Sequence, residues 1–340
     1  MASSAATHTP MEKQQQHEVA VVGAGIAGLA TAVALRRVGL PSLVLEKSPE
    51  LRAAGAALTL FPNAWRALEA LGVAHKLIPL YHAIERYASS SSSSPFFSSL
   101  LLFVIMPSSC MTIIVASSRS RVTDLSSRSA IRGLAVFPEG HELINAEALQ
   151  YLGDGKRAGL VSLNMKEMAA EDELSLIEVT ENLAKDFPPE VQMAVRHLDP
   201  ATVSWAPLLF RVPWNILLGR IHRGCVAVSG DAMHPMTPEI GQGGCAALED
   251  AVVLARNLAR ARSTAHLAAG VEGYTRERRW RSAGVVAAAY LSGWVQQGGN
   301  AGAWRWAAKW FRRRIYYRYI HHWIVEAIRE YDCGDLPPAE

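Results

Sequence analysis

The sequence predicts an α/β fold, in which a Rossmann-type nucleotide-binding domain carries an inserted, reduced sheet and is followed by a C-terminal helical segment. Two observations predict it. A glycine-rich turn, Val21–Ala30, follows a short apolar run near the N-terminus. A second glycine-rich turn, Ser229–Gly244, follows another apolar run about 200 residues later. Together the two turns indicate two halves of one nucleotide site.

The first turn has the order of elements that a dinucleotide site needs. The β-branched run Glu18–Val22 is interpreted as a buried strand, and Ile26–Val38 has the alanine and leucine content of a helix. Between them, Gly23 permits a tight turn and Gly25 lets the backbone approach a pyrophosphate. Gly28 lets the helix pack closely on the strand.

The residues after this turn identify the kind of nucleotide. The free amides at Ile26 and Ala27 and the positive end of the helix dipole would face the pyrophosphate. A second strand, Pro41–Leu45, ends at Glu46, which lies 18 positions after Gly28. A carboxylate there accepts hydrogen bonds from ribose hydroxyls and repels a 2′-phosphate, so the site prefers FAD or NAD to NADP.

The second turn favours FAD. The apolar run Gly224–Ser229 predicts a strand that delivers Asp231, whose carboxylate can accept hydrogen bonds from ribityl hydroxyls. The helix expected over Gln242–Leu258 would point its N-terminus at the flavin pyrimidine, where fixed amide dipoles stabilise the charge of the reduced ring. The residues expected to lie against the ring are Pro238, Gly241, Gln242, Gly243 and Gly244. A nicotinamide-dependent dehydrogenase has no need of this element, so that alternative is disfavoured.

At these residues the chain resembles the FAD-dependent aromatic hydroxylase family, and within it plant monooxygenases related to urate hydroxylase, salicylate hydroxylase and zeaxanthin epoxidase. The matching segments lie toward both ends: Val21–Ala30, Leu45–Lys47, Arg52 with Gly55–Leu58, Pro62–Trp65, Gly230–Asp250, Glu277–Ser282 and Asp332–Gly334. The resemblance implies that Glu46 and Arg52 bind the adenosine side of FAD and Asp231 its ribityl chain. It also implies that Gly241–Gly244 lines the isoalloxazine.

The resemblance implies a reaction as well. NADH or NADPH would reduce the flavin, and O2 would add to give a C4a-hydroperoxide that hydroxylates or epoxidises a small aromatic or isoprenoid-like substrate. The protein would orient the reactants and exclude water. Arg132, at the edge of the substrate domain, and Glu239, beside the flavin-facing turn, are the two candidate catalytic residues. His234 is interpreted as a hydrogen-bonded loop residue, with a general base as the alternative.

The middle of the chain departs from this family. No charged residue occurs from Tyr87 to Ser118, and Ser89–Ser94 is an unbroken serine run. Family members carry there an arginine-bearing helix, sheet strands and a Gly-x-Asp-Gly segment that serves both FAD and the nicotinamide, and no equivalent is found. A catalytically impaired FAD-binding protein is therefore the alternative function. Lost strands also predict exposed hydrophobic surface on the parallel sheet.

These observations divide the chain into segments with different expected roles. We expect a disordered tail at 1–17, the two parts of the FAD-binding domain at 18–86 and 211–262, a low-complexity insert at 87–129, a partial substrate domain at 130–210 and a helical segment at 270–340. The apolar stretch Leu100–Ala116 is interrupted by Pro107 and is short for a membrane span, so a disordered or loosely packed insert is favoured. Helices are expected at Glu178–Asp186 and Glu190–His197.

Composition limits the partners. A 340-residue chain that is 50% hydrophobic can form two cores, and a net charge of +3 is too small to indicate nucleic acid. Aromatic and arginine residues of Trp304–Tyr331 are expected to pack on the chain's own domain, with peripheral membrane contact as the alternative. The N-terminus lacks the apolar core of a secretory signal, so cytoplasm is expected, with a plastid as the alternative.

Cysteines and histidines give no metal site. The four cysteines are scattered without metal-ligand spacing, which favours reduced thiols inside a cell: Cys110, Cys225, Cys245 and Cys333. Cys225 in an expected strand and Cys245 in an expected helix are interpreted as packed small hydrophobes. The neighbours His321 and His322 would point to different sides of a helix, so a shared metal is not expected there.

Overall fold

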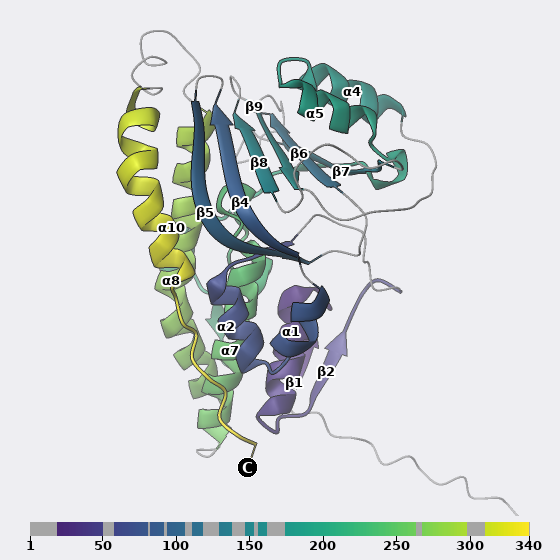
Figure 1. The fold of residues 1–340 in the computed structure, drawn as a ribbon. Helices are drawn as coiled ribbons and strands as arrows, with labels where there is room; N and C mark the ends of the chain where they lie inside the picture. The colour runs from purple at the N-terminus through teal and green to yellow at the C-terminus, as the bar shows by residue number, and fades with distance from the viewer. Residues whose placement is uncertain are drawn as a thin grey trace, which may run out of the picture.

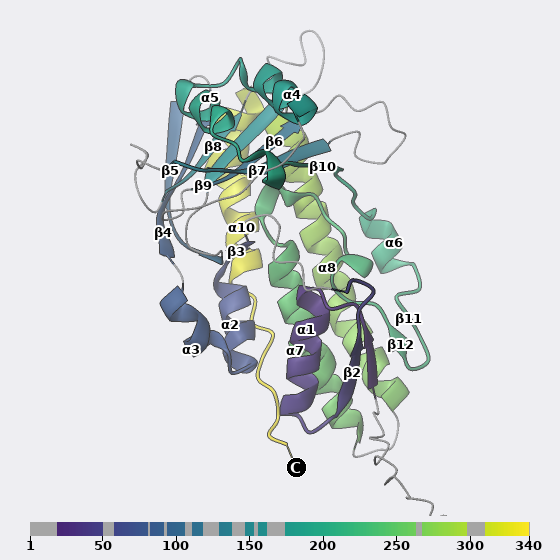
Figure 2. The same cartoon turned by 90° about the vertical axis from the view of Figure 1, so that its right-hand side faces the viewer.

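A computed structural model describes residues 19–49, 58–80, 82–91, 94–105, 111–117, 129–137, 147–152, 156–161, 174–262, 267–297 and 310–339. Within these residues a small parallel sheet with its helices lies at one end and a large mixed sheet at the other (Figure 1). The long helix α8 (Leu267–Gln297) runs past both parts, and the C-terminal tail returns alongside the helices of the first part (Figures 1 and 2).

The first part confirms the strand–turn–helix–strand order expected from the sequence. Strand β1 (Val19–Val22), helix α1 (Ile26–Arg37) and strand β2 (Ser42–Leu45) follow one another, and β1 pairs with β2 in parallel. The inner face of α1, with Ala34 and Leu35 fully buried, belongs to the main core. Apolar residues at helical spacing thus fix which side of α1 faces inward.

Strand β1 has no second parallel partner among the described residues. The run expected as a strand at Gly224–Ser229 forms only β12 (Val226–Ala227), which pairs antiparallel with β11 (His222–Arg223). The apolar residues of this region are correspondingly exposed, with Val22 84% and Leu45 48% accessible. Exposed hydrophobic surface on the short parallel sheet is the consequence expected from lost strands.

The turn between β11 and β12 corrects one expectation. Cys225 is not packed within a strand: it is exposed in the turn, next to Gly224 at φ +57°. Glycine readily adopts this left-handed conformation, so Gly224 supports a turn that includes Cys225, and β12 begins only after the cysteine. Cys245, in contrast, is buried in helix α7 (Gly243–Arg262), as expected.

The large sheet has eight strands within the described residues, in the order β10-β7-β6-β9-β8-β4-β5-β3. Their bounds are β3 Leu58–Leu60, β4 His82–Ser91, β5 Ser94–Ile105, β6 Met111–Ser117, β7 Ser129–Ala135, β8 Glu147–Leu152, β9 Lys156–Val161 and β10 Ser204–Pro207. Neighbouring strands pair antiparallel except β4 and β8, which are parallel. Several of these strands come from outside the segment 130–210, which the sequence predicts to be a partial substrate domain with a reduced sheet.

The difference arises in the segment expected to be a loosely packed insert. Residues of 87–129 supply half of β4 and all of β5 and β6, and serines of the run lie in paired strands, with Ser91 of β4 opposite Ser94 of β5. Aromatic and β-branched residues after the serines favour strands, and neighbouring strands satisfy their backbone groups. The apolar stretch Leu100–Ala116 is thus divided between two strands. In the part of the chain that the structure describes, no helix has both the length and the apolar character to span a bilayer.

Helices cover both parts. Helices α4 (Leu174–Ala184) and α5 (Pro189–Arg196) confirm the two helices expected there and pack on the large sheet, where Val191 and Val195 meet Ile131. The other elements are α2 Pro62–Ala70, α3 Ala74–Leu77, α6 Pro213–Leu217, α10 His321–Arg329, the π-helix η5 Arg312–Ile320, and the 3₁₀ helices η1 Ile78–Leu80, η2 Pro200–Thr202, η3 Gly230–Ala232 and η4 Pro238–Ile240.

The C-terminal tail packs on its own domain. Tyr316 and Cys333 are buried, and the guanidinium of Arg281 lies 4.3 Å from the ring of Tyr331. The Nη1 of Arg256 donates to the carbonyl of Cys333. These contacts support the expected packing of the tail on the protein.

Candidate functional site

The first glycine-rich turn links β1, α1 and β2. The amide of Gly23 donates to the carbonyl of Leu45 at 2.7 Å, and the amide of Ala24 donates to Oε2 of Glu46 at 2.6 Å. Gly23 has φ +102°, a conformation that favours glycine. A Cβ on Gly28 would lie 1.8 Å from the carbonyl oxygen of Gly23, so only glycine lets α1 pack this closely on the turn.

The same turn leaves room for a ligand. Among the described residues, nothing lies within 4 Å of where a Cβ of Gly23 or Gly25 would stand. The N-cap residue of helix α1 is Gly25, which makes no side-chain hydrogen bond to the helix. Within the described residues, the first turn of α1 also contains no acidic residue. Its first amides are therefore free to bind an anionic group such as a pyrophosphate.

The second turn contacts the first. Gly230 begins the 3₁₀ helix η3 with φ +58°, and a Cβ on it would lie 2.6 Å from the Cβ of Ala27 in α1. Asp231 follows directly and is exposed, as is Glu46. Two segments about 200 residues apart therefore meet, and each brings a solvent-accessible carboxylate.

The C-terminal part of the second turn, Gly241–Gly244, leads into helix α7. Gly241 has φ +64°, a conformation that favours glycine, and a Cβ on Gly244 would lie 2.5 Å from the end of the Leu58 side chain, which would have to shift to make room for it. The space next to Gly243 is open among the described residues. The side chain of Gln242 faces inward instead, where its Oε1 accepts a hydrogen bond from Asn63 at 2.9 Å. A ligand at this turn would therefore meet the Gln242 backbone.

The remaining predicted site residues are distributed differently. Pro238 begins the 3₁₀ helix η4, next to the buried Glu239. Arg132 lies in β7, where its backbone is paired with Ser204 of β10. Arg52 lies outside the described residues. Among the described residues, no cluster of histidine, cysteine and acidic residues can hold a metal ion.

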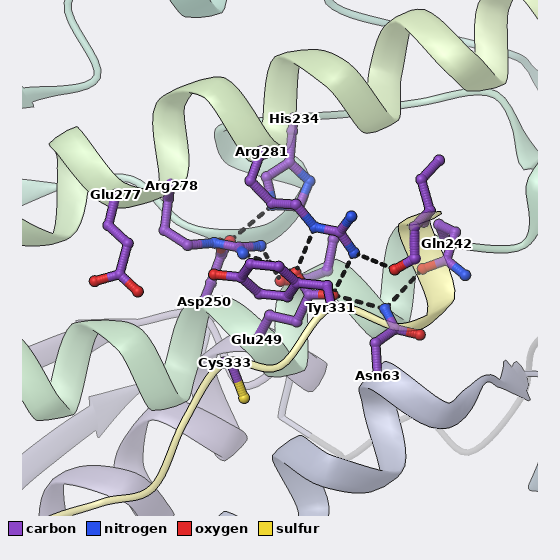
Figure 3. A network of polar contacts seen from close by, with 12 residues as sticks. Asn63, His234, Gln242, Glu249, Asp250, Glu277, Arg278, Arg281, Tyr331 and Cys333 are labelled. Atoms are coloured by element: carbon purple, nitrogen blue, oxygen red, sulfur yellow. Dashed lines mark hydrogen bonds and ion pairs between the residues drawn. The ribbon is translucent and has the colours of Figure 1, made fainter. Parts of the chain in front are cut away.

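Sequence reasoning missed a buried ionic network behind these turns (Figure 3). Arg278 of α8 is fully buried, and its Nε and Nη1 each lie 2.7 Å from a carboxylate, Asp250 and Glu249 respectively. Glu249 also accepts from Arg281 at 2.8 Å and from Asn63 at 2.6 Å. The sequence offered one indication of this network. Two acids and two arginines lie in alanine-rich stretches that were expected to be helices, and charges that are buried in a protein occur in pairs.

The network keeps its groups charged. Burial alone would raise the pKa of Asp250, but His234, Arg278 and a hydrogen bond from Gly230 outweigh it and lower the pKa to about 2. Burial likewise opposes the charge of Arg278, yet Glu249 and Asp250 raise its pKa well above the ordinary value. His234 itself is buried, with Nε2 2.7 Å from Oδ2 of Asp250. This confirms that His234 is a hydrogen-bonded loop residue.

Comparison with known proteins identifies related sequences and folds. The family model described as an FAD binding domain matches residues 16–148 and 191–289. Monooxygenase 2 of Arabidopsis thaliana is 31% identical over 414 residues, which cover 96% of this chain and all of the relative. An FAD-dependent urate hydroxylase of Klebsiella pneumoniae is 27% identical over 76% of this chain and 85% of its own length.

A solved structure shares the fold. The crystal structure of Klebsiella pneumoniae HpxO complexed with FAD and uric acid superposes with a TM-score of 0.67 at 21% sequence identity, over 94% of this chain and 99% of that one. The Arabidopsis alignment is longer than the 340 residues of this chain. That relative therefore contains internal segments that have no counterpart here.

Proposed function

This chain belongs to the FAD-dependent aromatic hydroxylase family, and from that membership we propose that it uses NADH or NADPH and O2 to hydroxylate or epoxidise a small aromatic or isoprenoid-like substrate. The observation that carries the proposal is the contact between Ala27 and Gly230, which joins the two glycine-rich turns into one site. When bound there, FAD would take reducing equivalents from the nicotinamide and activate O2.

The chain's own residues would hold the parts of FAD separately. The amides at the start of α1, from Gly25 to Ala27, would bind the pyrophosphate, because they have no cap among the described residues. Glu46 would accept hydrogen bonds from the adenosine ribose, with Arg52 on the same side, and Asp231 would bind the ribityl chain. These roles agree with the exposure of Glu46 and Asp231 next to the two turns.

The ring and the substrate would lie toward the large sheet. The backbone of Gly241–Gly244 would lie along the isoalloxazine, and Pro238 would shape the approach to it. The N-terminus of α7, which begins at Gly243, would stabilise negative charge on the reduced ring. Glu239 and Arg132 would border the substrate. The relative named for urate supports a small ring compound as the substrate class.

A coupled assay tests the proposal. Protein loaded with FAD is mixed with NADH or NADPH and a panel of phenols, hydroxylated heterocycles and isoprenoids under ¹⁸O2. The proposal predicts substrate-dependent oxidation of the nicotinamide and one ¹⁸O atom in the product. Nicotinamide oxidation that yields only peroxide with every substrate would contradict it.

A second candidate function is an FAD-binding protein with impaired turnover. It is favoured by the missing Gly-x-Asp-Gly segment and by the internal segments of the Arabidopsis relative that this chain lacks. That segment serves both FAD and the reduced nicotinamide in the family. Protein that retains FAD but does not oxidise NADH or NADPH would support this candidate over the first.

A further inference from the structure

A buried carboxylate connects both ends of the turn that carries Asp231. Oδ2 of Asp250 accepts a hydrogen bond from the backbone amide of Gly230 at 2.7 Å and another from Nε2 of His234 at 2.7 Å. Gly230 and His234 are the residues on either side of the segment that contains Asp231. Asp250 and His234 are fully buried, whereas Asp231 is exposed.

We infer that Asp250 and His234 are positioning residues, which hold the turn so that Asp231 faces the FAD site. This inference rests on the proposed function, since it concerns the same site. The carboxylate of Asp250 does not itself reach a ligand. Its effect on FAD affinity passes through the backbone of the turn.

The turn needs this support because its own hydrogen bonds are few. Helix η3 is a single 3₁₀ turn, closed by bonds from the amides of Met233 and His234 to the carbonyl of Gly230. The left-handed φ of Gly230 gives the chain a second conformation at little cost, since glycine populates both signs of φ. Two charge-assisted bonds to one carboxylate fix the first and the last residue of the turn together.

Arg278 orients that carboxylate. Its Nε donates to Oδ1 of Asp250, Nη1 donates to Glu249, and Nη2 donates to the carbonyl of Ala246 at 3.2 Å. Because Arg278 occupies Oδ1, Oδ2 is directed toward the turn. The ion pair between Arg278 of α8 and Asp250 of α7 is thereby connected, through the backbone of the turn, to Asp231 in the proposed FAD site.

Two substitutions of His234 separate hydrogen bonding from packing. His234→Leu fills the space but removes the donor, while His234→Gln keeps an amide N–H at about the position of Nε2. We expect FAD affinity to fall about tenfold in the leucine variant, equivalent to about 1.4 kcal/mol, and to stay within about twofold of wild type in the glutamine variant. The visible circular dichroism of bound flavin should change only in the leucine variant, because the turn then holds the ribityl chain differently.

A matched control comes from another ion pair between the same helices, Arg256–Glu277. Nη2 of Arg256 in α7 lies 2.5 Å from Oε1 of Glu277 in α8, and the other hydrogen bonds of these two side chains go to Cys333 and Asn257 rather than to the Asp231 turn. Glu277→Gln should lower the thermal stability of the protein without changing its FAD affinity. If the leucine variant does not fold, His234→Asn replaces it, because the shorter amide leaves the bond to Asp250 unmade.

The outcomes distinguish the inference from the function on which it rests. Wild-type protein that binds no FAD would overturn both. Wild-type protein that binds FAD, with the leucine and asparagine variants binding equally well, would overturn the inference and leave the function. Equal weakening in the leucine and glutamine variants would indicate packing alone and would also overturn it. Weak binding in the leucine variant with near-normal binding in the glutamine and Glu277→Gln variants supports it.

Discussion

Replacing Gly230 by alanine tests whether the two turns touch. The new Cβ would lie 2.6 Å from the Cβ of Ala27, and the residue would have to keep a φ of +58°. Gly224 is a matched control, because its φ is +57° and nothing lies within 4 Å of its Cβ position among the described residues. Gly224→Ala therefore carries the backbone strain alone, and Gly230→Ala carries the strain and the steric overlap.

The two costs can be estimated separately. A left-handed conformation costs about 1 kcal/mol for a residue other than glycine, which is the destabilisation expected for Gly224→Ala. Overpacking adds about 1–3 kcal/mol, so Gly230→Ala should lose about 2–4 kcal/mol of unfolding free energy. Urea denaturation of the FAD-free protein measures both values, with an unchanged slope showing that the unfolded states are comparable.

A second substitution identifies the contact. Ala27→Gly removes the Cβ that the new side chain meets, so combining it with Gly230→Ala should restore part of the lost stability. We expect the double variant to be about 1–2 kcal/mol more stable than the sum of the two single effects would give, because the two positions are in direct contact. Equal destabilisation by Gly230→Ala and Gly224→Ala, with additive double-mutant values, would refute the convergence of the turns.

Three further predictions concern charge and exposure. Glu46→Gln should weaken FAD binding about tenfold by weakening the ribose contact, as flavin fluorescence would measure, and unchanged affinity would argue against that role. Because the pKa of Asp250 lies below its unfolded value, at about 2, its contribution of about 2 kcal/mol to stability is complete above about pH 4 and is lost as pH falls through about 2. Urea midpoints across that range should fall more steeply for wild type than for Asp250→Asn. Burial raises the pKa of Cys245 and of Cys333 to about 12, so in native protein iodoacetamide should modify the exposed Cys225 and spare these two, as peptide mass spectrometry can determine. Rapid native labelling of Cys245 would contradict its burial.

The parts of the fold that were predictable are local in sequence. Gly23 and Gly28 act within one turn, and the alternation from strand to helix around them follows from residue periodicity. The convergence of the two turns could also be predicted, because a dinucleotide is long enough to need both. The exposed apolar residues of β1 and β2 followed from the absence of further parallel strands.

The parts that were missed depend on distant partners. The serine run Ser89–Ser94 has the composition of a linker, yet the backbone of Ser89–Ser91 is paired because β8, from later in the chain, lies beside it. Cys225 differs from the expectation because Gly224 forms a turn with it, so that β12 begins only at Val226. The bonds from Asp250 to Gly230 and from Arg278 to two acids join different elements, so no spacing within one element reveals them.

Equilibrium binding of FAD to the purified chain tests the central claim most directly. The flavin released from FAD-saturated, desalted protein by heat denaturation is quantified against protein concentration. Convergence of the two turns into one site predicts one FAD per chain in wild type and a clear loss in Gly230→Ala, while Gly224→Ala retains it. Colourless protein that takes up no FAD, or full occupancy in Gly230→Ala, would contradict the account.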